Sequence, residues 1–248
     1  MCRNPLFVVM AVLALTLPAP AAPPEESEGG DGAFTRMARR LLNGAADEVR
    51  SVRSTLTIDI FVEGESVSME QELSYELPDK IRNSIHTSLV EQVIVVNGKR
   101  GVAIAAGRSE AASAQRVEYG LRSLGRQLLV LAGNAGDPRL QVSAAGTEAV
   151  GSDECNVISV SFMGVESKLW IDPEGKALKQ RFKGRHFFDG TPGLVEINYF
   201  DYGEMGGALV PRTQTVSFEH QHLATLTVDS LELNPDLNAG LFELPAGG

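Results

Sequence analysis

Apolar and polar residues alternate along much of this chain, and the alternation predicts β-strands with one packed face and one wet face. It is clearest over residues 67–77, where Val67, Met69 and Leu73 alternate with polar residues. We expect further strands over residues 55–62, 81–87, 92–96, 139–145, 154–163, 165–172, 176–185, 194–201, 208–219 and 222–233. Roughly a dozen antiparallel strands in chain order form a meander that must curl, and its inner face must be covered.

Turn residues separate the expected strands. Asn97-Gly98 lies between VIVV and GVAIA, and both residues tolerate the positive φ of a type I′ hairpin turn. The Asp-Pro-Glu-Gly sequence at 172–175 has proline at the second turn position and glycine at its close. Pro211 lies inside a strand pattern, which indicates an edge or a bulge.

Two segments have helical instead of strand spacing. Residues 34–50 place apolar side chains at steps of three and four, with arginines between them. A membrane-surface helix is one interpretation, and a helix packed on a sheet is favoured. Residues 110–132 predict a second helix, whose apolar stripe comprises Val117, Leu121, Leu124, Leu128 and Leu131. Gly133, Asn134 and Gly136 then terminate it.

The N-terminus has the organisation of an export signal. Arg3 precedes an apolar run of about a dozen residues, which is too short to span a bilayer. We therefore predict a signal peptide over 1–22, cleaved after Ala21 or Ala22, with an uncleaved anchor as the alternative. Cys2 precedes the apolar run, so it is not placed as a lipid-accepting cysteine. An acidic, disordered linker is expected over 23–33 and one domain over 34–248.

Composition limits the function classes. The 248 residues are 43% hydrophobic, which suffices for one sizeable β-rich domain. The formal net charge of −10 argues against a nucleic-acid partner and against docking on anionic lipid headgroups. Once Cys2 is removed, Cys155 is alone, so no intramolecular disulfide can form. A reactive thiol or a dimer link is one interpretation of Cys155, but its apolar strand favours a buried, inert thiol.

The sequence contains little that indicates catalysis. It has no glycine-rich phosphate loop, no His-Glu-x-x-His and no Gly-x-Ser-x-Gly. His220 and His222 form one local pair, but no third ligand is forced into range, so a polar turn is favoured over a metal site. The carboxylate pairs Asp153-Glu154 and Glu70/Glu72 fall on strand edges or wet faces. We expect no catalytic residue, no metal and no cofactor.

A basic strand stands out in this acidic protein. Its cations are Lys176, Lys179, Arg181, Lys183 and Arg185, and the middle three share one face. They could meet an acidic partner, but an outward-facing strand of a large sheet is favoured. The single tryptophan, Trp170, lies on a neighbouring strand and is expected to pack against the cover of the sheet.

The order of elements resembles that of the LolA/LolB-like periplasmic family, and the second half resembles outer-membrane lipoprotein-sorting-like domains. Some of those domains accompany zinc peptidases of the insulinase type. The residues that carry the resemblance are turns and strand ends at 169–175, 198–204, 207–211, 233–236 and 241–245. It covers residues 34–245 and is more specific for fold than for function.

The resemblance implies a mainly β (α+β) fold, a curved antiparallel half-barrel of about 11–12 strands with helices covering its concave face. It implies a periplasmic, non-enzymatic carrier or chaperone that holds lipid, lipoprotein or another apolar ligand. Val117, Leu121, Leu124, Leu128 and Leu131 would then line a lid over the cavity. Two alternatives remain. The space under the helices is a filled core in place of an open cavity, or the protein is an accessory or sensor module for an envelope protease or regulator.

Overall fold

The computed structural model describes residues 30–45, 48–62, 65–87, 91–186 and 190–245. Within them, thirteen strands form one open antiparallel sheet in the order β6-β5-β4-β3-β2-β1-β13-β12-β11-β10-β9-β8-β7. The strands are β1 (Ser51–Val62), β2 (Glu65–Glu76), β3 (Lys80–His86), β4 (Glu91–Asn97), β5 (Arg100–Ala105), β6 (Arg108–Ala111), β7 (Gln141–Val150), β8 (Asp153–Phe162), β9 (Val165–Ile171), β10 (Ala177–Arg185), β11 (Pro192–Met205), β12 (Ala208–Phe218) and β13 (Gln221–Leu233). The helices are α1 (Gly30–Leu42), α2 (Ala114–Leu124), α3 (Leu128–Gly133) and the short 3-10 helix η1 (Ala239–Phe242).

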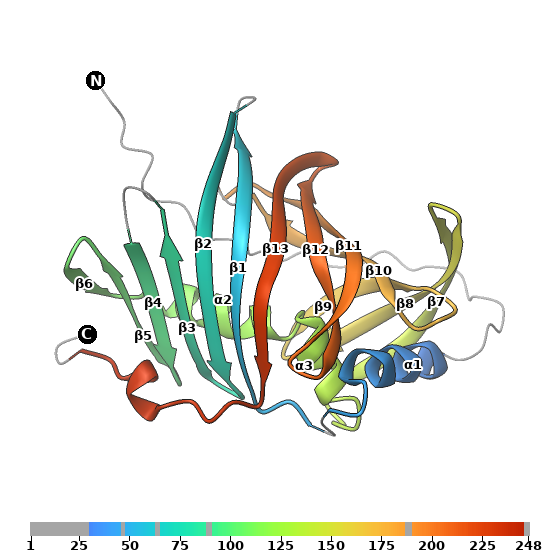
Figure 1. Ribbon diagram of the computed structural model, residues 1–248, viewed down its shortest axis with the longest axis horizontal. Helices are drawn as coiled ribbons and strands as arrows, with labels where there is room; N and C mark the ends of the chain where they lie inside the picture. Colours follow the sequence, from blue (N-terminus) through green and yellow to red (C-terminus); the bar gives the residue numbers. More distant parts are fainter. Residues whose placement is uncertain (1–29, 46–47, 63–64, 88–90, 187–189, 246–248) are drawn as a thin grey trace.

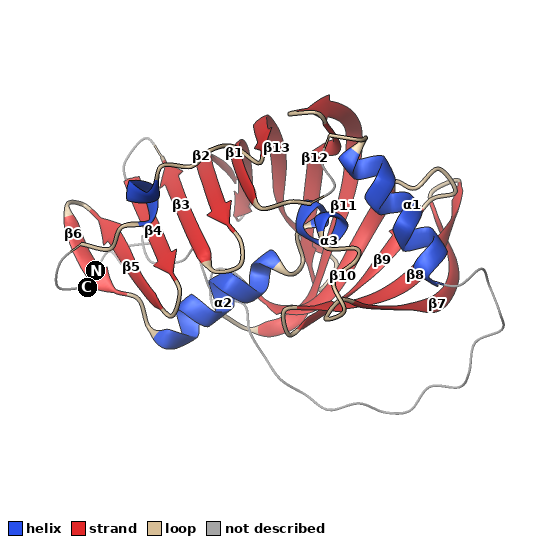
Figure 2. Ribbon diagram, turned by 90° about the horizontal axis from the view of Figure 1, so that it is seen from below, coloured by secondary structure: helices blue, strands red, loops and turns tan. Residues whose placement is uncertain are grey.

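The sheet is the predicted curved half-barrel, with the helices on its concave side (Figures 1 and 2). Every strand pairs with its neighbour in sequence except at one place, where β1 pairs with β13 and joins the first run of strands to the last. The chain therefore leaves one edge of the sheet at β6 and returns at the opposite edge with β7. The connection between these edges contains α2 and α3, and it crosses the concave face (Figure 2).

Helix α1 is shorter at its C-terminus than the predicted helix over 34–50. It begins at Gly30, inside the segment expected to be linker, and ends at Leu42. Asn43 and Gly44 then take positive φ values of 47° and 76°, the left-handed backbone that commonly ends a helix. The predicted signal peptide lies outside the described residues. None of the helices in the described residues is both long enough and apolar enough to span a membrane.

The single helix predicted over 110–132 is wrong, because the structure has a strand and two helices there. Residues 108–111 form the short edge strand β6, which raises the strand number above the expected 11–12. Ser113 then caps α2, its side chain accepting a hydrogen bond from the Arg116 backbone N–H. The helix stops at Gly125, where an added Cβ would lie 2.6 Å from the Phe162 carbonyl oxygen. Only a glycine allows this close approach of the two backbones.

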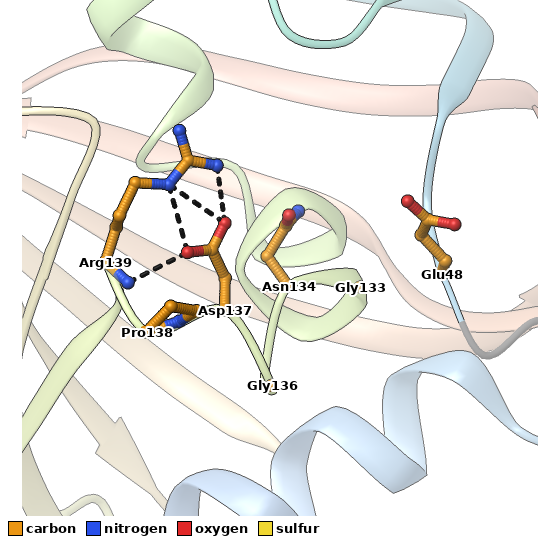
Figure 3. Close-up of a pocket in the computed structure, with 7 residues that line it drawn as sticks. All are labelled: Glu48, Gly133, Asn134, Gly136, Asp137, Pro138 and Arg139. Atoms are coloured by element: carbon orange, nitrogen blue, oxygen red, sulfur yellow. Dashed lines mark hydrogen bonds and ion pairs between the residues drawn. The ribbon is translucent and has the colours of Figure 1, made fainter.

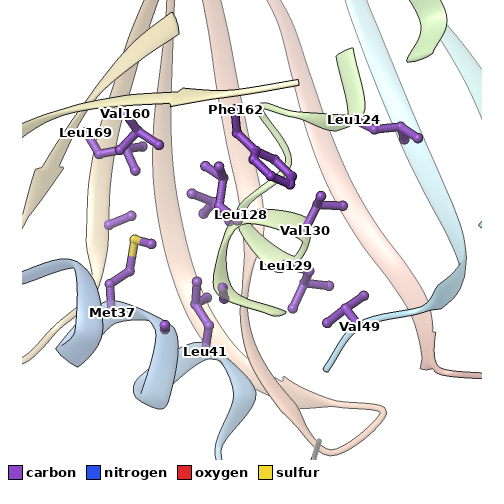
Figure 4. Packing of buried hydrophobic residues seen from close by; sticks show 14 of the residues in the cluster. Met37, Leu41, Val49, Leu124, Leu128, Leu129, Val130, Val160, Phe162 and Leu169 are labelled. Carbon is purple, nitrogen blue, oxygen red and sulfur yellow. The ribbon is translucent and has the colours of Figure 1, made fainter. Parts of the chain in front are cut away.

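The main apolar cluster fills the space between the helices and one part of the concave face (Figure 4). It includes Met37 and Leu41 of α1, Leu124 of α2, Leu128 and Leu131 of α3, and strand residues such as Val52, Ile158 and Leu169. Every residue of α3 is buried. Burial of this extent makes the helices part of the folded core and not a loosely attached cover.

Trp170 does not pack against the helical cover, so that prediction is wrong. Its neighbours Leu169 and Ile171 belong to the main apolar cluster, and alternation therefore places Trp170 on the outer face. There it forms a small separate cluster with Cys155 and Val157. This outer cluster explains why β8 and β9 have apolar side chains on both faces.

Candidate functional site

The register identifies which residues share the concave face. Val52 belongs to the main apolar cluster, and β1 pairs with β2 without interruption from one end to the other. Because side chains alternate along a strand, Ile58 and Ile60 point to the same side as Val52. Their cross-strand partners are Met69 and Val67, respectively. The concave side of β1 is thus apolar except for the buried Ser54 over about 26 Å, from Val52 to Ile60, at about 3.3 Å per residue.

A second apolar cluster lies on this face beyond the helices. Its buried members are Ile60, Met69, Ile85 and Ala224, with Ile58, Val216 and Leu226 packed against them. All seven belong to strands, and among the described residues no helix side chain joins them. Val67, on the same face beside Ile60, is 50% exposed. The strands bury the four main members among themselves, and the exposed Val67 at their margin is the part of this face available for an interaction.

The five predicted lid residues lie between α2, α3 and the sheet. Four of them are buried members of the main apolar cluster: Val117, Leu124, Leu128 and Leu131. The fifth, Leu121, is partly buried and packs against the same cluster. The structure therefore brings the five together, as the spacing predicted, in the filled part of the concave face. Their role as a lid over a ligand stays a prediction.

A hydrogen-bond network joins the end of α2 to the concave face. The side chain of Gln180 is buried and donates from Nε2 to the Arg126 carbonyl at 3.1 Å. Its Oε1 accepts from the Tyr199 hydroxyl at 2.8 Å. Burial raises the pKa of Tyr199 well above the usual range, so its phenol stays a neutral donor. The Arg126 guanidinium lies 4.4 Å from the centre of the Phe182 ring.

A polar pocket of about 530 Å³ lies where α3 ends, and it is separate from both apolar clusters (Figure 3). It is lined by Glu48, Gly133, Asn134, Gly136, Asp137, Pro138 and Arg139. Asp137 pairs with Arg139, and this contact lowers the pKa of the carboxyl group to about 2. None of the five predicted lid residues lines this pocket.

The other residues considered for catalysis or metal binding are exposed or make structural contacts. His220 lies in the β12–β13 turn with a φ of 67°, while His222 stacks on Phe61 with ring centres 4.7 Å apart. Asp153 and Glu154 are exposed at the start of β8. Within the described residues, no group of three or more His, Cys, Asp or Glu side chains is arranged to hold a metal ion.

The basic strand β10 is largely neutralised on the outer face. Lys179 and Arg181 lie over the Trp170 ring, at 4.4 and 5.0 Å from its centre. Glu148 accepts from the Trp170 indole at 3.0 Å and lies 3.7 Å from Lys179. Arg181 donates to Glu196 at 2.7 Å. This supports an outward-facing structural strand over a docking site for an acidic partner.

Cys155 is buried, as its strand pattern predicted. Burial raises the pKa of its thiol, and the nearby carboxylates of Asp172 and Asp153 raise it further. A thiol in this environment stays protonated at neutral pH and is a poor nucleophile.

Comparison with solved structures identifies the fold. A LolA superfamily protein from Nitrosomonas europaea superposes with a TM-score of 0.58 at 10% identity, over 88% of this chain and 99% of that chain. The chain has the LolA-like fold. A putative outer membrane lipoprotein-sorting protein domain from Vibrio parahaemolyticus gives a TM-score of 0.51 at 11% identity, over 83% of this chain and 97% of that chain.

A third structure with a LolA-like arrangement is a DUF1329 family protein from Desulfovibrio piger. Its TM-score is 0.54 at 11% identity, over 86% of this chain and 97% of that chain. No family model and no curated protein matches the sequence. The LolA-like resemblance inferred from turns and strand ends is thus confirmed for the fold.

Sequence reasoning missed the groups that surround the uncovered part of the concave face. Arg126 and Phe182 are 56 residues apart and meet only because α2 crosses the sheet. The members of the second apolar cluster were predicted as strand residues, but not as a group that lacks a helical cover. Alternation identifies the face of each strand, whereas the reach of the helices depends on tertiary packing.

Proposed function

We propose that this protein is a non-enzymatic, periplasmic binding protein that carries a lipid, a lipoprotein or another apolar ligand on its concave face. The observation that carries the proposal is the second apolar cluster, because it continues the packed face of the sheet beyond the helices. Covering the apolar area that stays exposed beside it, at Val67 and at the partly buried Ile58, Val216 and Leu226, is favourable by about 25 cal/mol per Å². A ligand with an acyl chain would supply that burial.

Two further findings support this proposal. Similar folds occur in a protein named as an outer membrane lipoprotein-sorting domain, although the likeness itself extends only to the fold. The predicted signal over 1–22 would deliver the chain to a compartment where an apolar cargo needs shielding from water. The proposal assigns no catalytic step to any residue.

Native mass spectrometry of the purified protein, followed by lipid extraction, tests the proposal. We expect a co-purified apolar ligand, or micromolar binding of a neutral apolar reporter such as 1-N-phenylnaphthylamine. The variant V67D places a carboxylate beside Ile60 at a half-exposed position, so it should weaken reporter binding at least tenfold without unfolding the protein.

The matched control is S68D, because Ser68 is the next residue on β2, is exposed and points to the outer face. It adds the same charge and should leave binding unchanged. A folded wild-type protein that holds no ligand and binds no reporter would overturn the proposal. Equal effects of V67D and S68D would do the same. In that case the alternative of an accessory module for another envelope protein would be favoured.

A further inference from the structure

One flank of α2 is basic and partly buried beside the uncovered part of the concave face. Arg116 and Tyr119 lie about 60° apart around α2 at 100° per residue, and Arg126 lies in the turn that follows the helix. The Nε atoms of Arg116 and Arg126 are buried and have no hydrogen-bond partner. By contrast, the neighbouring Arg122 is paired with Glu118 at 2.7 Å.

Neither of these two arginines is neutralised within the described chain. Among the described residues, no carboxylate oxygen lies within 4 Å of the Arg116 or Arg126 guanidinium. Burial lowers the pKa of both arginines, and the charge of Arg122 lowers that of Arg126 further. Burial also raises the pKa of Tyr119, which leaves a neutral hydroxyl near Arg126. A desolvated cation without a counter-ion is costly and favours the binding of an anion.

The strand register connects Arg126 to the second apolar cluster. One row of cross-strand partners runs over the concave face from Ile60 through Ala224, Val216 and Ile197 to Gln180. Gln180 donates to the Arg126 carbonyl. Three strand spacings of about 4.8 Å separate Ala224 from Gln180, so the contact with Arg126 lies about 14 Å from the buried centre of the cluster. This distance is within the length of a twelve-carbon chain.

We propose that the ligand is an anionic amphiphile, whose acyl chain covers the second apolar cluster and whose carboxylate or phosphate headgroup binds Arg126. This inference rests on the proposed function and names the class of ligand. The guanidinium fork matches the oxygens of both headgroups, and the resulting hydrogen bonds are charge-assisted. Arg116 lies about two helical turns before the end of α2 and contributes positive potential in place of a second contact.

Displacement of 1-N-phenylnaphthylamine by matched twelve-carbon ligands tests the inference. Laurate and dodecyl phosphate carry the anion, and dodecanol is the neutral analogue. We expect both anions to bind the wild-type protein at least tenfold more tightly than dodecanol, which corresponds to about 1.4 kcal/mol. R126Q should reduce this preference to within about twofold, and R116Q should reduce it less.

R122Q is the matched control, because it removes a nearby arginine whose charge is already paired with Glu118. It should retain the full preference for the anions. R126K keeps the charge but loses the fork, so an intermediate preference is expected. Trp170 fluorescence and thermal melting confirm that each variant is folded. If R126Q does not fold, two measurements decide the result: the preference of the wild-type protein for the anions over dodecanol, and the same preference in R126K.

The outcomes separate this inference from the function on which it rests. Equal binding of laurate, dodecyl phosphate and dodecanol would overturn the anionic ligand and leave the apolar carrier standing. A folded R126Q protein that keeps the tenfold preference would also overturn the assignment of Arg126. Failure of all three ligands and of the reporter itself would overturn the carrier, and the inference with it.

Discussion

Replacing Leu131 by alanine tests whether the apolar stripe of α2 and α3 acts as core or as lid. The Leu131 side chain is fully buried in the main apolar cluster. The substitution removes three carbon groups, and their transfer from water is worth about 0.8 kcal/mol each. The cavity left behind raises the total to about 3–5 kcal/mol. For a domain of this size, such a loss lowers Tm by about 6–20 °C.

Urea unfolding followed by the fluorescence of Trp170 measures this loss directly. Trp170 is the only tryptophan and is buried on the outer face, so the substitution does not alter its surroundings in the folded state. L121A is the matched control, because Leu121 is only partly buried and its truncation should cost less. As a core residue, Leu131 should affect stability far more than the affinity for an apolar ligand.

A core role for Leu131 would be refuted if the free energy of unfolding of L131A lay within about 1 kcal/mol of that of the wild-type protein. A large loss of ligand affinity at nearly unchanged stability would instead show that Leu131 belongs to a lid that moves. The two quantities, the free energy of unfolding and the Kd of a neutral reporter, therefore distinguish the two roles that the sequence left open.

Two other predictions concern the polar contacts of the fold. Asn234 has a φ of 53°, accepts from the backbone of Arg50 at 2.7 Å and donates to Glu48, so N234A should lose about 2–3 kcal/mol in urea unfolding. N234G should lose less, because glycine tolerates this φ, and equal losses would contradict the backbone contribution. The Asp137 carboxyl should titrate near pH 2 by NMR and return toward its ordinary pKa in R139A. Because its folded pKa is depressed, its contribution to stability is complete above the ordinary pKa and is lost as the pH falls toward 2; an unchanged midpoint in R139A would contradict the pairing.

Much of this fold could be predicted from local patterns, because the alternation within each strand indicates which of its two faces is packed. Alternation over 67–77 corresponds to an observed strand, and the hairpin predicted at Asn97-Gly98 is present. Its loop is Gly98–Lys99, however, because Asn97 pairs with Arg100 and only Gly98 has a positive φ, so the predicted type I′ turn is wrong. The four residues of β6, Arg108–Ala111, are all exposed and too few for a periodic signal. This strand is stabilised by its pairing with β5. The four residues of β6 do not by themselves predict that pairing.

The helix boundaries depended on contacts that lie far away in sequence. The apolar stripe from Val117 to Leu131 keeps helical spacing across Gly125, so the break between α2 and α3 is invisible to periodicity. It follows from the approach of Gly125 to the Phe162 carbonyl on β8. Similarly, the apolar residues around Trp170 indicated burial but not on which side of the sheet, since both faces of β8 and β9 are packed.

The topology explains why one face of the sheet contains both a filled core and an uncovered apolar surface. The chain must return from edge strand β6 to edge strand β7, and α2 and α3 make this crossing over only part of the concave face. Side chains under the crossing, such as Leu131, complete the core. Beyond it, the strands continue apolar toward Ile60 and Met69, while Arg126 follows the end of α2 and lies over Phe182. A crossing that completes the core thus ends in a cation beside the part of the face that no helix covers, and this arrangement suits an amphiphile better than a wholly apolar ligand.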